Sequence, residues 1–162
     1  MKTINNLRGL LVLVFLGIMS FSCNQEETMI FDTDGSVYFT TADYSYSFLD
    51  YPGKQVDTIK LPVQIFGKTA DVDRLVKIEL VTDDTSKVNT APEELYSLIG
   101  GVVPANEQLG SVSLELRHAD ELKDTVYAFY VRIVPNDDFK DVTYNSRIVE
   151  VLFTAKEIQP AN

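Results

Sequence analysis

Hydrophobic and polar residues alternate along most of this chain, in short stretches that turn residues separate. An alternation of period two buries one face and exposes the other, which is typical of a β-strand. Ile59, Leu61 and Val63, for example, fall on one face while Lys60 falls on the other. The pattern predicts strands at residues 36–40, 44–48, 56–66, 75–82, 110–117, 125–134 and 147–154, with a short extended piece at 102–104. About seven to eight short strands with almost no helical periodicity predict an all-β protein, a β-sandwich of immunoglobulin-like type.

Three local signals refine this prediction. Residues 125–134 are apolar on nearly both faces, which places that strand in the middle of a sheet. Pro62 cannot donate a hydrogen bond to a ladder, so the strand at 56–66 is expected at an edge or to carry a bulge. Pro92 and the two glutamates after it predict a helical turn within residues 91–98, which the glycines at 100 and 101 end.

The start of the chain has the features of an export signal. Lys2 and Arg8 precede an apolar run, residues 10–21, that has the length of a signal-peptide core and is short for a membrane span. Cys23, the only cysteine, follows where a lipoprotein signal peptidase would expect its lipid-carrying residue. The site resembles a bacterial lipobox of the relaxed Bacteroidetes type, with Ser20 in place of the usual Leu. We expect cleavage before Cys23 and diacylation of its thiol; the alternative is a plain secretory signal that leaves Cys23 a free thiol.

This interpretation divides the chain and places it in the cell. The segment Asn24-Gln25-Glu26-Glu27 is similar to the short acidic signal that sends such lipoproteins to the outer face of the outer membrane. The expected location is therefore the outer membrane, with a lipid on Cys23 as the anchor and the domain facing the cell exterior. The expected parts are a lipoprotein signal peptide (1–22), a lipidated tether (23–34), a β-sandwich domain (35–156) and a polar tail (157–162).

Composition excludes one class of partner. The chain has 24 acidic and 14 basic residues, and loss of Lys2 and Arg8 with the signal leaves 12 basic residues, a net charge of about −12. Such a surface repels nucleic acid, and no basic run offsets it. With Cys23 lipidated, no thiol remains for disulfides or thiolate metal sites. The fold must depend on packing, for which a single domain of this size is sufficient.

Several segments carry a resemblance to a known family. They are Gly35-Ser36-Val37-Tyr38-Phe39, DTIKLPV at 57–63, DRLVKIE at 73–79, LKDT at 122–125, VRIV at 131–134 and NDDF at 136–139. Over roughly residues 31–154 the chain resembles the DUF4843 family, Bacteroidetes lipoproteins of unknown function that are often encoded beside SusC/SusD-like glycan-uptake systems. The resemblance implies a Calx-β-like sandwich, and glycan or SusC/SusD-like envelope proteins as partners. Its motifs carry no catalytic identity.

The residues offer little for catalysis. His118 is the only histidine, and it lies beside Arg117 and Asp120 in a polar stretch that predicts a solvated loop. Nucleophilic catalysis needs a histidine placed to accept a proton, and an imidazole metal site needs two or three. Two carboxylates would suffice for a glycosidase, but the acidic residues here fall mostly in turns and on solvent faces. The sequence predicts no enzyme and no cofactor.

Two sets of residues are candidates for ligand binding. Tyr38, Tyr44 and Tyr46 are clustered near the first strands, and alternation points Tyr38 away from Val37 and Phe39. Aromatic faces bind sugars by stacking, and this chain has no tryptophan. Half-buried sheet packing is the competing interpretation of such a tyrosine stripe.

Two pairs of aspartates are the only metal candidates. Asp83 with Asp84, and Asp137 with Asp138, fall in predicted turns. Calx-β-like sandwiches can bind calcium with loop carboxylates, and calcium takes six to eight oxygen ligands. Because no D-x-D-x-D-G loop occurs, a solvated-turn interpretation is favoured over calcium binding.

These observations predict a surface-anchored, non-catalytic accessory or glycan-binding component of an outer-membrane polysaccharide-utilisation system. The first alternative is a structural or protein-interaction module of the cell envelope, with an exposed sheet edge around residues 56–65 as its contact. A carbohydrate-active enzyme is a second alternative, which the single histidine and the absence of tryptophan disfavour.

Overall fold

The computed structural model of the chain describes residues 35–142 and 147–156, all of them within one compact unit, Phe31–Asn162. The predicted signal peptide, Cys23 with its tether and the polar tail lie outside the described residues, so lipidation of Cys23 stays a prediction. No helix in the described part of the chain is long and apolar enough to cross a membrane.

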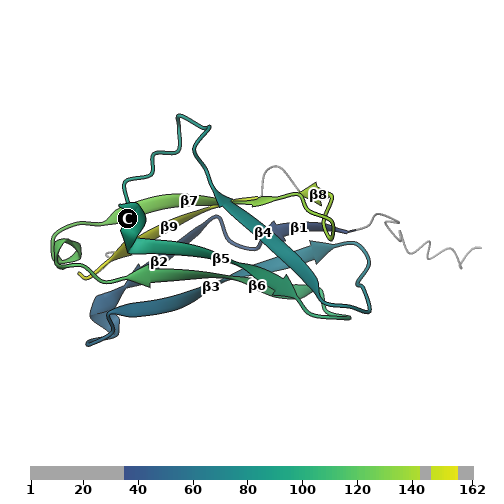
Figure 1. Cartoon of the computed structure of the whole chain (residues 1–162), viewed down its shortest axis with the longest axis horizontal. Coiled ribbons are helices and arrows are strands. Elements are labelled where there is room, and N and C mark those ends of the chain that lie inside the picture. Colours follow the sequence, from purple (N-terminus) through teal and green to yellow (C-terminus); the bar gives the residue numbers. More distant parts are fainter. Residues whose placement is uncertain (1–34, 143–146, 157–162) are drawn as a thin grey trace, which may run out of the picture. The chain divides into compact units, whose positions relative to one another are not determined.

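Nine strands in the described residues form one curled sheet, in the order β2-β9-β7-β4-β5-β6-β3-β1-β8 (Figure 1). Their bounds are β1 Ser36–Phe39, β2 Asp43–Ser47, β3 Val56–Phe66, β4 Arg74–Leu80, β5 Tyr96–Val103, β6 Leu109–Arg117, β7 Tyr127–Val134, β8 Asp141–Val142 and β9 Ile148–Thr154. The short 3-10 helices η2 Phe48–Asp50, η3 Glu93–Leu95 and η4 Asp120–Lys123 lie between strands, and no α-helix occurs in this part of the chain. The predicted all-β class is confirmed, with nine strands where the sequence predicted seven or eight.

The sheet curls because β4 changes partner midway. Its first three residues, Arg74 to Val76, pair with β5, whereas the next four, Lys77 to Leu80, pair with β7. Figure 1 shows β4 crossing β5 diagonally on its way to β7. The chain also changes sides between β1, which pairs with β3, and β2, which pairs in parallel with β9.

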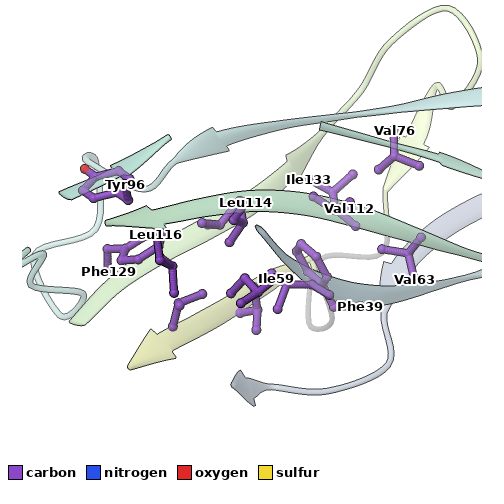
Figure 2. Close-up of a cluster of buried hydrophobic side chains, with 14 of the residues drawn as sticks. Phe39, Ile59, Val63, Val76, Tyr96, Val112, Leu114, Leu116, Phe129 and Ile133 are labelled. Carbon is purple, nitrogen blue, oxygen red and sulfur yellow. The ribbon is translucent and has the colours of Figure 1, made fainter. Parts of the chain in front are cut away.

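One hydrophobic core fills the inside of the curl. Val112, Leu114 and Leu116 of β6 are fully buried at alternate positions, as predicted. Across the core, the rings of Tyr96 on β5 and Phe129 on β7 stack with centroids 4.3 Å apart. Figure 2 shows these side chains converging between the strands. Burial of this kind stabilises a fold by roughly 1.5–3 kcal/mol for each large apolar side chain.

The largest correction concerns residues 96–103. The sequence predicted that a helical turn would continue to residue 98 and that glycines would end it, but only η3 is helical and Tyr96–Val103 is strand β5. The glycines are sheet residues, because a Cβ on Gly101 would lie 2.2 Å from Ser111 O and one on Gly110 would lie 2.4 Å from Val102 O. Only glycine lets the backbones of β5 and β6 approach this closely.

The edge predicted at residues 56–66 is correct for part of the strand only. β3 lies between β6 and β1, and β1 covers its last four residues, Val63 to Phe66. Pro62 sits where β1 leaves, and its carbonyl accepts from Thr40 N at 3.2 Å. An interaction through this edge is thereby confined to residues 56–61. The prediction that the strand at 125–134 is central is confirmed, since β7 lies between β9 and β4.

Candidate functional site

Three neighbouring strands place a short polar row on the solvent face of the sheet. Asp43 of β2 lies opposite Glu150 of β9, and Glu150 lies opposite Tyr130 of β7. Their chain neighbours Phe129 and Val149 are buried, so alternation turns the side chains of the row outward. Tyr130 Oη donates to Glu150 Oε1 at 2.5 Å, which joins β7 to β9 on this face.

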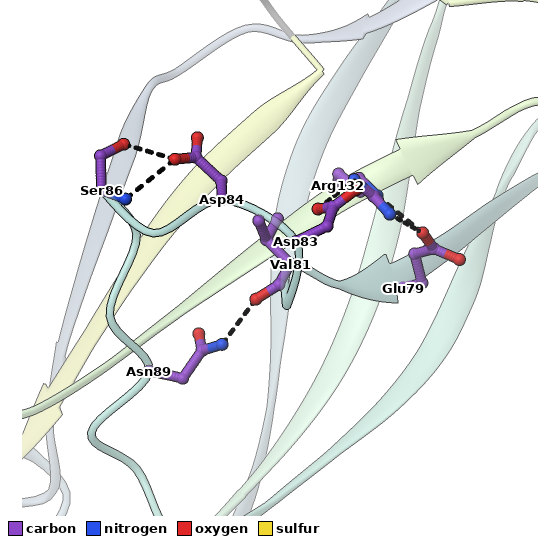
Figure 3. Close-up of polar contacts among 7 residues, drawn as sticks. All are labelled: Glu79, Val81, Asp83, Asp84, Ser86, Asn89 and Arg132. Atoms are coloured by element: carbon purple, nitrogen blue, oxygen red, sulfur yellow. Dashed lines mark hydrogen bonds and ion pairs between the residues drawn. The ribbon is translucent and has the colours of Figure 1, made fainter.

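The loop that follows β4 is fastened beside this row. Val81 N donates to Tyr130 O at 2.9 Å. The Asn89 side chain accepts from Tyr130 N at 2.8 Å and donates to Val81 O at 2.6 Å. Arg132, also on β7, donates to Asp83 Oδ1 at 2.7 Å (Figure 3). These bonds hold an otherwise irregular segment against the edge of β7.

A turn in the same loop carries two more charged groups to the row. Asp84 Oδ1 accepts from Ser86 N at 2.9 Å and from Ser86 Oγ at 2.6 Å, and Lys87 N donates to Asp84 O at 3.0 Å. The turn places Lys87 Nζ 5.1 Å from the centre of the Tyr130 ring, a cation–π distance. Because the lysine stem is flexible, its ammonium can share the ring or move to donate to a ligand.

These groups enclose a hollow of about 460 Å³, here named the Tyr130 pocket. It is lined by Asp43, Asp84, Lys87, Tyr130 and Glu150, together with Ala42 and Ile148. The carboxylates accept hydrogen bonds, the ammonium donates them, and the phenol ring offers an apolar face. This combination suits a ligand that is rich in hydroxyl groups and has an apolar face of its own.

Hydrogen bonds shift the pKa of two groups in the pocket. The hydrogen bond to Glu150, followed by burial, raises the pKa of the Tyr130 hydroxyl, so it remains a donor at neutral pH. The hydrogen bonds from Ser86 lower the pKa of Asp84, which keeps that carboxyl ionised. The pocket therefore presents a hydroxyl donor at Tyr130 and a carboxylate acceptor at Asp84.

A second hollow, of about 500 Å³, lies between β4 and β5. This β4–β5 groove is lined by residues 75–78 of β4, residues 98–101 of β5 and residues 136–138 of the β7–β8 loop. Leu75 and Ile99 are 64% and 60% exposed, and no aromatic residue lines the groove. Its lining is aliphatic and glycine-rich apart from Lys77, Asn136, Asp137 and Asp138, whereas charged groups make up most of the Tyr130 pocket.

The structure places Tyr44 and Tyr46 on one strand and Tyr38 on another. Tyr38 lies on β1, near one end of the strand order, whereas Tyr44 and Tyr46 lie on β2 at the other end. Tyr38 and Tyr44 are half-buried, and Tyr46 is only 6% exposed, so its ring offers little surface to a ligand.

Tyr46 belongs to a polar network that ties β2 to β3. Its hydroxyl donates to Asp57 Oδ2 at 2.6 Å, and Lys54 Nζ donates to the same oxygen at 2.8 Å. The Tyr51 ring stacks on Tyr46 with centroids 5.5 Å apart. The bonds from Lys54 and then Tyr46 lower the pKa of Asp57, while burial and Asp57 raise the pKa of Tyr46. We interpret this network as a structural tie.

The predicted aspartate pairs lie at opposite ends of β4. Asp138 Oδ2 accepts from Leu75 N at 2.8 Å, at the start of β4, and Asp137 lies beside it. The last residue of β4, Leu80, lies five residues and about 17 Å further along the strand than Leu75, and Asp83 and Asp84 come after it in the loop. One calcium ion could not bridge the two pairs, and the described residues hold no group of three His, Cys, Asp or Glu arranged for a metal ion.

His118 packs as a structural residue. Its ring meets Phe48 edge-on with centroids 5.3 Å apart, and its backbone N donates to Gln55 O at 2.8 Å. None of the residues that line the Tyr130 pocket is close to it in sequence. That His118 has no catalytic role stays a prediction.

Sequence reasoning missed the Tyr130 pocket as a site. Alternation placed Tyr130 on a different face from Phe129 and gave Asp84 as a metal candidate, but nothing linked those residues to Asp43 or Glu150. Knowledge of which strands pair, and in which register, was the missing signal.

The fold places this chain among all-β domains built on a single curled sheet. Within that class it belongs to the DUF4843 family, a domain of unknown function, whose match covers residues 22–162. The resemblance seen in the sequence is thereby confirmed. No curated protein sequence matches the chain.

Two solved structures are similar in fold. One is a candidate carbohydrate-binding protein from Bacteroides ovatus ATCC 8483, with 13% identity and a TM-score of 0.56 over 74% of this chain and 36% of that chain. The other is a two-domain protein with unknown function from Bacteroides fragilis NCTC 9343, with 16% identity and a TM-score of 0.51 over 82% of this chain and 50% of that chain. This chain spans half or less of either protein, and the likeness shows a shared fold alone.

Proposed function

We propose that this protein is a non-catalytic accessory lipoprotein that binds glycan through the Tyr130 pocket. The observation that carries the proposal is the composition of that pocket: one tyrosine ring, three carboxylates and one ammonium around a hollow of about 460 Å³. Sugars present hydroxyl groups at their edges and C–H groups on their faces. The pocket offers a partner for each kind of group.

Charge narrows the glycan class. Asp43, Asp84 and Glu150 outnumber Lys87, and the whole chain carries a net charge of −10. Sulfated or uronic-acid polysaccharides would meet repulsion at this surface. Neutral glycans, or glycans with free amino groups, are the class that this pocket would accept.

The direction of the Asp84 pKa shift supports a binding role for that residue over a hydrolytic one. A glycosidase acid must keep its proton near neutral pH, which requires a raised pKa. The pKa of Asp84 is instead lowered, because Ser86 donates hydrogen bonds to its carboxylate. Asp84 therefore serves as an ionised hydrogen-bond acceptor in the pocket.

The sequence at the start of the chain and the family resemblance support a setting for the proposed function. We place the protein on the outer membrane with its lipid on Cys23, facing the exterior, as an immunoglobulin-like or Calx-β-like sandwich. It would work beside SusC/SusD-like envelope proteins. The fold likeness to a candidate carbohydrate-binding protein from Bacteroides ovatus ATCC 8483 agrees with this role.

Native affinity gels with a panel of neutral, aminated and anionic polysaccharides test the proposal. The chain from Asn24 onward, which contains the whole compact unit, should be retarded by a neutral or aminated glycan, with or without calcium. Tyr130→Ala should abolish the retardation, because it removes both the ring and the bond to Glu150.

Tyr38→Ala is the matched control, because Tyr38 is also half-buried but lies on β1. If Tyr38→Ala abolished retardation while Tyr130→Ala did not, the site would be wrong. If every glycan left the wild-type protein unretarded, the glycan-binding role itself would be lost. Release of sugar from a retarding glycan would instead favour an enzyme.

A further inference from the structure

The β4–β5 groove exists because a ladder stops early. β4 and β5 form only three residue pairs, from Arg74–Val103 to Val76–Gly101. Beyond Val76, β4 pairs with β7 alone, while β5 from Tyr96 to Gly100 pairs with β6 alone. In the described part of the chain, neither residues 77–80 of β4 nor residues 96–100 of β5 therefore have a strand partner on the side where the two strands separate.

The backbone of β4 directs polar groups into this space. In an antiparallel ladder, successive residues turn their N–H and C=O groups to opposite sides. Val81 N donates to Tyr130 O on β7, and Leu75 N, six residues earlier, donates to Asp138 on the same side of β4. Alternation therefore turns the backbone groups of Ile78 and Leu80 away from β7 and toward β5. Ile78 lines the groove and Leu80 lies two residues beyond it on β4, so an added strand that extends past the groove could bond to both of them.

The β5 wall is shaped for a close approach. The register with β6 shifts between Leu98 and Gly100, which leaves Ile99 as an extra residue whose side chain is 60% exposed. Gly100 has φ 95° and a Cβ there would lie 3.3 Å from Val76 O, so the base of the groove holds backbone and no side chain. Bulges and glycines at strand edges are common where another backbone comes near.

Charge defines one end of the groove. Asp138 is held by Leu75 N, and Asn136 Nδ2 donates to Leu75 O at 2.8 Å, so these two residues are fixed beside the start of β4. Asp137 lies between them with its side chain exposed. Lys77 of β4 also lines the groove, but the carboxylates of Asp137 and Asp138 outnumber it, so on a chain of net charge −10 this end of the groove complements a cationic group.

We propose that the β4–β5 groove binds an extended segment of a partner protein, which adds a strand between β4 and β5. The backbone of the segment would bond to Ile78 and Leu80, its apolar side chains would contact Ile99 and Leu75, and a Lys or Arg would lie near Asp137. This is strand addition at a sheet edge, in which the backbone provides affinity and alternate side chains provide specificity. The inference is independent of glycan binding at the Tyr130 pocket.

Selection of displayed random decapeptides on the purified chain from Asn24 onward tests the inference. Enriched peptides should alternate apolar and polar residues and carry a Lys or Arg toward one end. In hydrogen exchange followed by NMR, the amides of Ile78 and Leu80 should exchange rapidly in the free protein, unlike those of Lys77 and Glu79. A bound peptide should slow the exchange of Ile78 and Leu80 at least about tenfold, as expected for new backbone hydrogen bonds.

Ile99→Asp places a charge in the groove and should weaken peptide binding about tenfold or more, which is the effect of about 1.4 kcal/mol. Leu109→Asp is the matched control: Leu109 is also 60% exposed, but it lies on β6 outside the groove, and this variant should bind as wild type. Asp137→Lys should weaken the basic peptides selectively.

Three results would overturn the inference. The first is failure to enrich any peptide, and the second is binding that Ile99→Asp leaves unchanged in a folded variant. The third is protection of Ile78 and Leu80 in the free protein by self-association, which would make a second copy the occupant. Glycan retardation by the Ile99→Asp variant remains a separate readout, so loss of one function does not obscure the other.

Discussion

The β3–β6 and β4–β5 ladders belong to one sheet, yet they differ in how far their strands stay together. β3 and β6 form nine residue pairs, from Val56–Arg117 to Gln64–Leu109, whereas β4 and β5 form three before they separate. The strands of the long ladder stay paired over its whole length, and side chains such as Leu61 and Leu114 are fully buried there. The short one leaves backbone edges beside a hollow. In this fold, a surface able to bind a strand arises where pairing ends early.

The largest expected effect lies in the long ladder. Leu114 of β6 is fully buried, so Leu114→Ala should lower the free energy of unfolding by roughly 2–5 kcal/mol through lost burial and a cavity. Ile99→Ala in the groove should change it by about 0.5 kcal/mol or less, because Ile99 is 60% exposed. Urea unfolding of both variants measures the difference. Equal losses would mean that the groove is part of the core.

The second-largest loss of stability is expected at Gly101, where β5 pairs with both β4 and β6. Gly101→Ala should destabilise the fold by roughly 1–3 kcal/mol, because its Cβ would lie 2.2 Å from Ser111 O and must push β5 away from β6. The urea midpoint should fall accordingly. A neutral Gly101→Ala variant would show that β5 does not approach β6 this closely.

The loop that carries Asp84 and Lys87 of the Tyr130 pocket depends on Asn89. Asn89→Ala removes the bonds to Val81 O and Tyr130 N and should lower the free energy of unfolding by about 1–2 kcal/mol. Because the same loop holds Asp84 and Lys87, glycan retardation should weaken as well. Peptide binding in the β4–β5 groove should persist. If Asn89→Ala lost stability but kept its glycan retardation, the loop would not contribute to glycan binding.

A smaller effect concerns the tie between β2 and β3. Lys54, and then Tyr46, lower the pKa of Asp57, so its carboxylate adds stability above its ordinary pKa. That contribution is lost as the pH falls through the lowered folded value. Between pH 7 and pH 2 the thermal midpoint of wild type should therefore fall further than that of Asp57→Asn. If the thermal midpoints of wild type and Asp57→Asn fell equally over this pH range, the bonds to Asp57 would not stabilise the fold.

Side-chain periodicity was enough to predict the all-β class and the faces of β3, β6 and β7, because each of these strands buries alternate large side chains. It failed for β5, where Gly100 and Gly101 resemble a stop signal. The reason for those glycines is the close approach to β6, a contact between segments that the local pattern does not record. The sheet edge predicted from Pro62 is correct for the first part of β3 only, because β1 pairs with its last four residues.

The candidate sites were also predicted only in part. Alternation predicted the correct face for Tyr130, but it could not identify Asp43 and Glu150 as its partners, because they lie on strands far away in the sequence. Register between such strands depends on the packing of the whole sheet. Asp84 was singled out for calcium, whereas in the structure its carboxylate caps a turn and lines the Tyr130 pocket. Tyr46 matched the aromatic pattern and proved to be buried.

The most direct test of the glycan-binding claim is an amide NMR titration of the isotope-labelled chain with oligosaccharides from the same neutral and aminated glycans. We expect the largest shifts on Asp43, Tyr130 and Glu150 and on the loop with Lys87, and we expect Tyr130→Ala to remove them. Shifts centred on Tyr38, or no shifts with any oligosaccharide, would contradict the glycan-binding claim.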